Sequence, residues 1–205
     1  VGTRDTSNLS RYTVDFAFNY QNINPYLDFL VNDLLVSEGG IVEGTFYQRE
    51  NATLFLYGEV DSLEYKGVKY YENTLEANAS KDVDSLGIIA NVYLHSDRQA
   101  WKKIPETRDL SLEAVWFNNK VTLQTNIKQP DNKNSAQINS ELKLQRDKLV
   151  FNFMPSNMTA FGERWYFNPY NKIEIRENEI AVDKLEVYKG EQAIRLEGIF
   201  SDKAE

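Results

Sequence analysis

The stretch Ser85–His95, SLGIIANVYLH, decides the fold class of this 205-residue chain. Apolar side chains stand at every second position, at Leu86, Ile88, Ala90, Val92 and Leu94. A period of two places them on one face of an extended strand, whereas a helix would repeat them every three or four residues. The stretch therefore predicts a strand with one apolar face.

The same alternation continues on both sides of this stretch. It is found at 12–20, 53–60, 110–117, 120–128, 136–144, 148–154, 171–176, 178–188 and 192–200. Short polar segments such as Asn118-Asn119 and Arg146-Asp147-Lys148 separate the runs and are typical of hairpin turns. The pattern predicts roughly a dozen strands. We expect a mostly β fold, a long curled antiparallel sheet.

One segment follows a helical period instead. In residues 24–36, NPYLDFLVNDLLV, the apolar positions are Leu27, Leu30, Val31, Leu34 and Leu35. Asn24 has the chemistry of an N-cap and Pro25 suits the first helical position. Gly39-Gly40 would end the helix. The sequence predicts one short amphipathic helix near residues 24–36, lying across the sheet or closing its end.

A short phrase occurs twice. Residues 60–67 read VDSLEYKG and residues 182–190 read VDKLEVYKG, and each is followed by another alternating run. Two interpretations stay open at this point. The phrase is either ordinary hairpin sequence or the mark of a repeated structural unit.

Composition excludes several classes of function. The formal net charge is −8, which disfavours a nucleic-acid partner because phosphate backbones are repelled. The chain has no cysteine, so disulfides and thiolate metal sites are excluded. No apolar run reaches the roughly 18 residues of a membrane helix. The start lacks both a methionine and a signal layout, so we expect residues 1–205 to be a single β-rich segment of a longer protein.

Catalytic motifs are scarce. His95 is the single histidine, and its place beside Leu94 at the end of an alternating run predicts a surface strand position. No phosphate-binding glycine loop, nucleophile elbow or calcium loop occurs. We therefore expect no enzymatic activity, no cofactor and no metal.

One carboxylate cluster supports an alternative. Glu59, Asp61 and Glu64 spell E-x-D-x-x-E, similar to the catalytic strand of laminarinase-type glycosidases, in which two Glu act as nucleophile and general acid. Ser62 departs from that pattern, and Glu64 needs a bulge to join the other two. This reading predicts a carbohydrate-active or carbohydrate-binding β-sandwich with Glu59 and Glu64 converging in a cleft.

Several segments together resemble a known family. They are INPYLDFL (23–30), GGIVEGTF (39–46), LYGEVDSLEYKGVKYYENTLEANAS (56–80), SLGIIANVYLHSD (85–97) and the stretch 158–203, which contains Arg164-Trp165 and Asn171-Lys172-Ile173. In this order they resemble the large TamB/AsmA-like envelope proteins, in particular TamB of the Bacteroidetes type. The resemblance covers most of the chain and lies in the pattern, not in a catalytic motif.

The resemblance implies a long curled sheet, a β-taco or groove-like half barrel, that shields phospholipid acyl chains between the inner and outer membranes. It also implies a periplasmic location in a Gram-negative envelope, an inner-membrane anchor in the full-length protein, and an outer-membrane barrel assembly protein as partner. The expected groove lining is Leu54, Leu56, Leu86, Ile88, Ala90, Val92, Leu94, Val121, Leu123, Ile127, Leu142, Leu144, Phe151 and Phe153. Thin residues such as Gly58, Ala90 and Thr125 would leave room between them.

The residues alone leave the alternatives open. Alternating aliphatic side chains also form the closed core of a sandwich, in which case the chain is a plain adhesion or scaffold module. The decisive question is whether the apolar stripe faces an open channel or a closed interior.

Overall fold

The computed structural model describes residues 11–82, 87–130 and 133–201 and consists of strands with one short helix. The first elements are β1 (Tyr12–Asn19), α1 (Asn24–Leu30), β2 (Leu34–Val36), β3 (Ile41–Gln48), β4 (Asn51–Tyr65), β5 (Val68–Asp82), β6 (Ile88–Ala100) and β7 (Thr107–Phe117). The others are β8 (Lys120–Lys128), β9 (Ser135–Leu144), β10 (Leu149–Phe153), β11 (Asn157–Ala160), β12 (Glu163–Phe167), β13 (Lys172–Arg176), β14 (Glu179–Lys189) and β15 (Gln192–Ser201). The mostly β prediction is confirmed.

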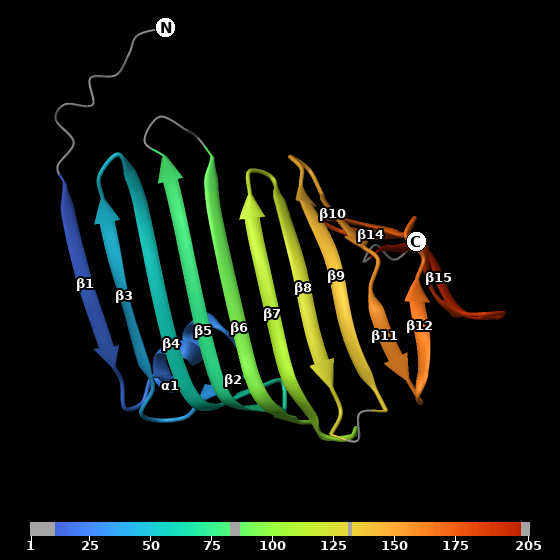
Figure 1. The fold of residues 1–205 in the computed structure, drawn as a ribbon, viewed down its shortest axis with the longest axis horizontal. Helices are drawn as coiled ribbons and strands as arrows, with labels where there is room; N and C mark the ends of the chain where they lie inside the picture. Colours follow the sequence, from blue (N-terminus) through green and yellow to red (C-terminus); the bar gives the residue numbers. More distant parts are fainter. Residues whose placement is uncertain (1–10, 83–86, 131–132, 202–205) are drawn as a thin grey trace, which may run out of the picture.

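All the strands belong to one antiparallel sheet (Figure 1). From β3 to β10 each strand pairs with the next one along the chain, as expected for strands joined by hairpins. The β4–β5 hairpin turns at Lys66-Gly67, where both residues have positive φ (49° and 79°), the conformation of the favoured two-residue hairpin turns. The sequence expectation of a long antiparallel sheet is therefore correct.

The sheet forks after β9. One end of β9 pairs with β10 and the other end with β11, and the two branches meet again on β14, through β13 and β12. Asn171 lies at this fork and is almost fully buried. Its side chain accepts a hydrogen bond from the Phe153 N–H (2.7 Å) and donates to the Phe153 carbonyl (2.8 Å). These bonds replace the strand pairing that the fork interrupts.

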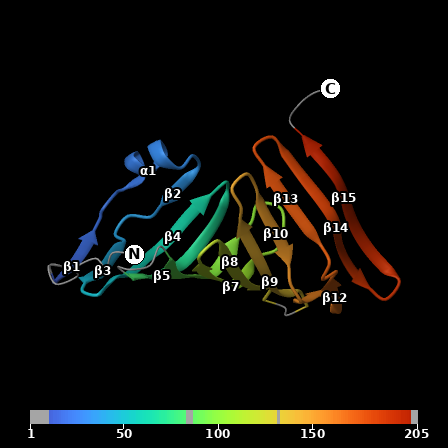
Figure 2. The ribbon, with the colours of Figure 1, turned by 90° about the horizontal axis from the view of Figure 1, so that it is seen from above.

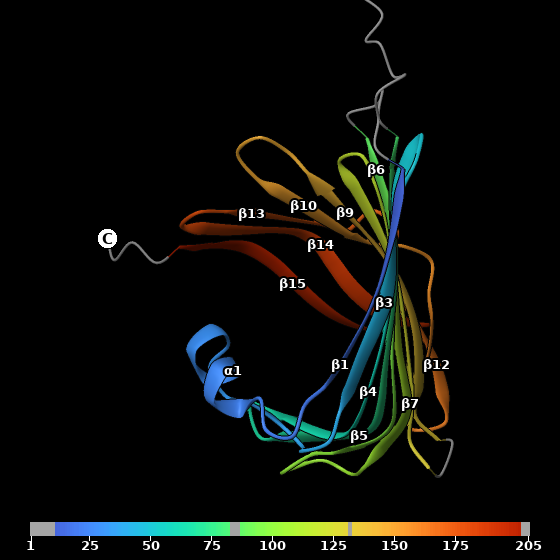
Figure 3. The same ribbon diagram turned by 90° about the vertical axis from the view of Figure 1, so that its left-hand side faces the viewer.

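The sheet is curled toward one side. Figure 3 shows the lower ends of the long strands β4 to β7 turning toward the side on which α1 lies. Figure 2 shows α1 with β2, and the strands β13 to β15, projecting from the same side of the sheet. We call the concave space that these elements border the trough.

Cross-strand register places apolar residues on one face of the sheet. One row of directly opposed residues runs from β1 to β9: Phe18, Val42, Gly58, Leu75, Leu94, Leu112, Thr125 and Ile138. Directly opposed residues point to the same side of a sheet, so the row is one continuous stripe. The alternate positions carry polar residues such as Glu76, Glu113 and Gln124.

The sheet is a single layer with little buried core. Among the described residues the buried hydrophobic side chains are Val150 and Val182. The chain exposes 14,619 Å² of surface, whereas a compact monomer of 23.7 kDa exposes roughly 9,800 Å². The apolar stripe is therefore not interlocked with an opposing layer in the described part of the chain.

The predicted helix is shorter than the sequence pattern indicated. It ends at Leu30, and Leu34–Val36 form β2 against β4 because Asp33, with φ of 63°, breaks the helical path. Asn24 is not the N-cap. Its side chain instead makes two hydrogen bonds with the Val36 backbone, donating to the carbonyl (2.8 Å) and accepting from the N–H (2.7 Å). The helix is thereby tied to β2, and Gly39-Gly40 has no part in ending it.

The repeated phrase marks two strand ends of similar construction. Both copies lead into a two-residue turn before the returning strand, at Lys66-Gly67 after β4 and at Gly190-Glu191 after β14. In β14 a register shift between Val182 and Leu185, with Lys184 at φ of 51°, changes which alternate positions face the apolar side. In β4, Val60 and Leu63 also both line one cavity despite their odd spacing. Each Val-Asp-x-Leu therefore keeps its two apolar residues together across an irregular point.

Candidate binding trough

A cavity of about 490 Å³ lies in the trough. Its apolar lining comes from the stripe and from the turned strand ends: Ile41, Val42, Val60, Leu63, Leu75, Leu94, Leu110 and Leu112. Gly58 and Thr125 line it as well, between larger neighbours in the same row. An added Cβ at Gly58 would meet no atom closer than 3.5 Å, so that position is open. The small residues help to make the stripe hollow at this point.

Buried polar residues hold the turned end of the trough. The Asn73 amide donates to the carbonyls of Val60 (3.2 Å) and Tyr70 (3.1 Å), and the Ser96 hydroxyl donates to the Tyr71 carbonyl (3.1 Å). Burial raises the pKa of the Tyr70 hydroxyl. These bonds satisfy backbone carbonyls where β4, β5 and β6 turn, so this end is rigid and its polar atoms are already engaged.

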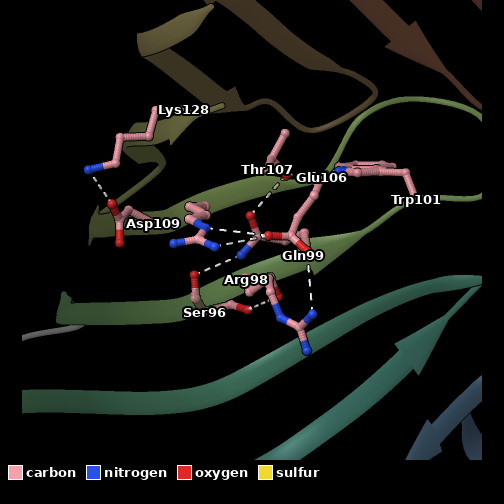
Figure 4. A network of polar contacts seen from close by, with 9 residues as sticks. Ser96, Arg98, Gln99, Trp101, Glu106, Thr107, Asp109 and Lys128 are labelled. Carbon is pink, nitrogen blue, oxygen red and sulfur yellow. Dashed lines mark hydrogen bonds and ion pairs between the residues drawn. The ribbon is translucent and has the colours of Figure 1, made fainter. Parts of the chain in front are cut away.

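A second network of hydrogen bonds extends from Ser96 to Thr107 and Trp101 (Figure 4). Gln99, which is fully buried, donates to the Ser96 carbonyl (2.7 Å) and accepts from the Thr107 hydroxyl (3.0 Å). Trp101 donates its indole N–H to the same hydroxyl (2.8 Å). The network links β6 to β7 across the irregular 101–106 connection. Its role is to fix the strand ends, because each group bonds within the protein.

The predicted lining residues lie together on the apolar face. Cross-strand pairing places thirteen of them on that face: Leu54, Leu56, Ile88, Ala90, Val92, Leu94, Val121, Leu123, Ile127, Leu142, Leu144, Phe151 and Phe153. Leu86 lies outside the described residues. Only Leu94 of the set lines the cavity itself. The prediction missed Leu75 and Leu112, although Leu112 stands in the alternating run 110–117.

Two of the three acidic residues of the alternative reading, Glu59 and Glu64, have separate partners. Glu59 accepts a hydrogen bond from the Tyr57 hydroxyl, which raises the pKa of Tyr57. Glu64 forms an ion pair with its cross-strand neighbour Lys69 (3.8 Å). The β4–β5 register is the same before and after Asp61, and Glu59 lies at the cavity of the trough.

His95, which follows Leu94 in β6 and also lines the cavity, belongs to a polar cluster. Its Nε2 lies 2.8 Å from the Asp97 carboxylate, and ligand atoms of His95, Asp97 and Asp109 lie within 4.8 Å of one another. That spacing would permit metal binding. However, Asp109 is already in contact with the ammonium group of Lys128. Asp97 and Asp109 thus each already have a partner within the described chain.

Comparison with protein-family models, curated proteins and solved structures found no match. Among the described residues no helix has the length and apolar character needed to cross a membrane, and α1 has only seven residues.

Proposed function

We propose that this chain is a noncatalytic segment of a TamB-like envelope protein and that its trough shields phospholipid acyl chains. In this proposal the chain works in the periplasm of a Gram-negative bacterium, with a membrane anchor elsewhere in the full-length protein. An outer-membrane barrel assembly protein is the proposed protein partner. The membrane anchor and the barrel assembly partner are taken from the sequence resemblance.

The observation that carries the proposal is the uncovered apolar face. The stripe through Leu75, Leu94 and Leu112 faces a cavity rather than an opposing layer of the described chain. Monomeric proteins rarely leave such a continuous apolar surface without a ligand or a partner. The opposite face is mixed: it carries Glu76, Glu113 and Gln124, and also exposed apolar side chains such as Phe55, Ile89 and Val115.

Acyl chains match this surface energetically. Moving a methylene from water to an apolar site gains about 0.8 kcal/mol. A dozen methylenes would thus gain roughly 10 kcal/mol before the costs of immobilising the lipid. The trough needs no charged pocket for this task, and the polar groups at its turned end are engaged with the backbone.

The test is lipid extraction and native mass spectrometry of protein purified from cells. We expect phospholipid to accompany the wild-type chain. Leu94→Lys places an ammonium group in the apolar path and should reduce bound lipid at least about tenfold.

Val115→Lys is the matched control, because Val115 is similarly exposed but stands on the opposite face, in β7. It should leave bound lipid unchanged. Circular dichroism of both variants reports that the sheet is intact. A wild-type protein free of lipid, or equal loss in the two variants, would contradict the proposal.

A further inference from the structure

Two tyrosine side chains, Tyr20 and Tyr70, stand among the residues that line the cavity in the trough. Tyr20 directly follows β1, and Tyr70 is near the start of β5. Both are half-buried, and burial raises the pKa of each hydroxyl, so both hydroxyls keep their protons at neutral pH. Each can therefore donate a hydrogen bond.

Neither tyrosine hydroxyl has a hydrogen-bond partner among the described residues. Asn73 and Ser96, which line the same cavity, differ in this respect because their side chains already donate to backbone carbonyl groups. A tyrosine hydroxyl that is removed from water usually finds a partner, and leaving it unpaired costs free energy. A ligand with a hydrogen-bond acceptor would supply the missing partner.

A glycine makes room for the Tyr20 ring. The Tyr20 N–H donates to the Gly40 carbonyl (3.2 Å), and a Cβ at Gly40 would collide with the Tyr20 hydroxyl oxygen. Gly40 is itself buried. The contact holds the Tyr20 hydroxyl at a defined place in the wall of the cavity.

The apolar lining continues away from the two tyrosines. Tyr70 stands opposite Leu63 of β4, on the side of the cavity where β1 ends and β5 begins. From β5 the stripe runs through Leu75, Leu94 and Leu112 across β6 and β7. The cavity thus combines two free hydroxyl donors with an apolar path, which is the pattern that suits an amphiphilic ligand.

The charges around the cavity favour a neutral acceptor. No lysine or arginine is among the described residues that line it, whereas Glu59 is. A carboxylate placed there would lose hydration without meeting one of these cations, and Glu59 would repel it. An ester carbonyl accepts hydrogen bonds without carrying a charge.

We propose that Tyr20 and Tyr70 donate hydrogen bonds to the ester carbonyl of an acyl lipid, whose tail follows Leu75, Leu94 and Leu112. This inference rests on the proposed function, because it orients a lipid within the same trough. It adds a polar contact to a recognition that the stripe alone would base on hydrocarbon area.

Ester-linked and ether-linked lysophosphatidylcholines of the same tail length test the assignment. The ether form has a methylene in place of the carbonyl, so without the hydrogen bonds it should bind at least as tightly as the ester. We expect the wild type to bind the ester form about two- to tenfold more tightly in calorimetric titrations below the micellar concentrations. Tyr20→Phe and Tyr70→Phe should each reduce this preference and leave the affinity for the ether form unchanged.

Tyr166→Phe is the matched control, because Tyr166 in β12 is 43% exposed and does not line the cavity. It should retain the preference for the ester. A wild type that binds both forms equally, or the ether form more tightly, would overturn this inference and leave lipid binding intact. The same conclusion would follow if both tyrosine variants kept the full preference. Failure of either lipid to bind would overturn the proposed function and this inference together.

A free fatty acid and its methyl ester test whether the acceptor is neutral. At pH 8 the methyl ester should bind the wild type more tightly, because the carboxylate of the free acid is repelled by Glu59. Glu59→Gln should narrow that difference. Tighter binding of the free acid to the wild type would overturn the assignment of an ester carbonyl.

Discussion

At the scale of single residues, Gly44 shows how close contacts restrict the sequence. It stands in β3 opposite Phe16 and Leu56. A Cβ at this position would lie 2.4 Å from the Phe55 carbonyl oxygen and 2.6 Å from the Phe16 ring. Since the first of these atoms is backbone, a side chain cannot be accommodated without moving the strands.

We therefore predict that Gly44→Ala lowers the free energy of unfolding by about 1–3 kcal/mol. Gly58→Ala is the control, because a Cβ there meets only ordinary contacts, and its effect should stay within about 1 kcal/mol in either direction. Urea unfolding followed by circular dichroism measures both. Equal destabilisation by the two substitutions would show that the close approach at Gly44 does not affect the free energy of unfolding.

Glu174 makes stability depend on pH. Lys172 in β13 and Lys148, just before β10, contact its carboxylate, and they lower the pKa of Glu174 to about 2. Because the pKa in the folded state lies below that in the unfolded chain, the ionised form stabilises the fold above about pH 4.5. This contribution is lost as the pH falls from 4.5 toward 2.

The corresponding prediction compares Glu174→Gln with the wild type in urea at several pH values. The wild type should have the higher unfolding midpoint at pH 7, and the difference should shrink progressively below pH 4.5. Glu177→Gln removes the same charge from an exposed turn and serves as the control. A difference for Glu174→Gln that is the same at pH 7 and pH 2.5 would contradict this assignment.

At the scale of elements, the fork between β9 and β14 depends on side chains rather than on strand pairing. Asn171 satisfies both backbone groups of Phe153, and the Ser156 hydroxyl accepts from the Asn139 N–H (2.9 Å) on the other side of the gap. A split sheet leaves buried backbone groups that must find other partners. The two polar residues are therefore structural requirements of this topology.

Asn171→Ala should lower the free energy of unfolding by about 1–3 kcal/mol, because it leaves the half-buried N–H and carbonyl of Phe153 without their side-chain partner. Asn157→Ala removes an exposed amide in β11 and should change it by less than about 0.5 kcal/mol. Urea unfolding again measures the effect. Tolerance of Asn171→Ala would mean that water or a local rearrangement replaces the lost hydrogen bonds.

Period-two alternation was sufficient to predict most strands, because each strand has one apolar and one polar face. It failed where geometry is set by tertiary contacts. The residues at 34–36 continue a helical pattern, yet the Asn24 side chain and the edge of β4 draw them into β2. The sequence pattern did not predict the fork, because Asn171 and Ser156 bind partners that are distant along the chain.

At the scale of the whole molecule, the curl of the sheet could be anticipated only from the family resemblance. Alternation predicts which residues share a face but not whether that face is covered. The thirteen described stripe residues share a face, but the cavity also depends on the turns of β4 to β7, which the pattern does not encode. Gly58, which the sequence analysis expected to leave room, lines this cavity. Because the sheet is a single layer, the exposed area of the chain is about one and a half times that of a compact monomer.

Because the trough is open, we expect bound ligands with hydrocarbon tails to stabilise the folded chain. A ligand that binds only the folded state at a hundred times its Kd adds about 2.7 kcal/mol, which for a chain of this size raises Tm by roughly 5–10 °C. We predict that lysophosphatidylcholines below their micellar concentrations raise Tm. Their affinity should increase up to about fourfold per added methylene, until the apolar stripe is filled.

Glycerophosphocholine, which carries the same headgroup without a tail, should leave Tm unchanged, and Leu94→Lys should flatten the dependence on chain length while Val115→Lys retains it. A response that is independent of tail length would place recognition at the headgroup. Such a result would argue against a hydrocarbon-shielding role for the trough, because the apolar stripe can discriminate ligands only by the area of hydrocarbon that it covers.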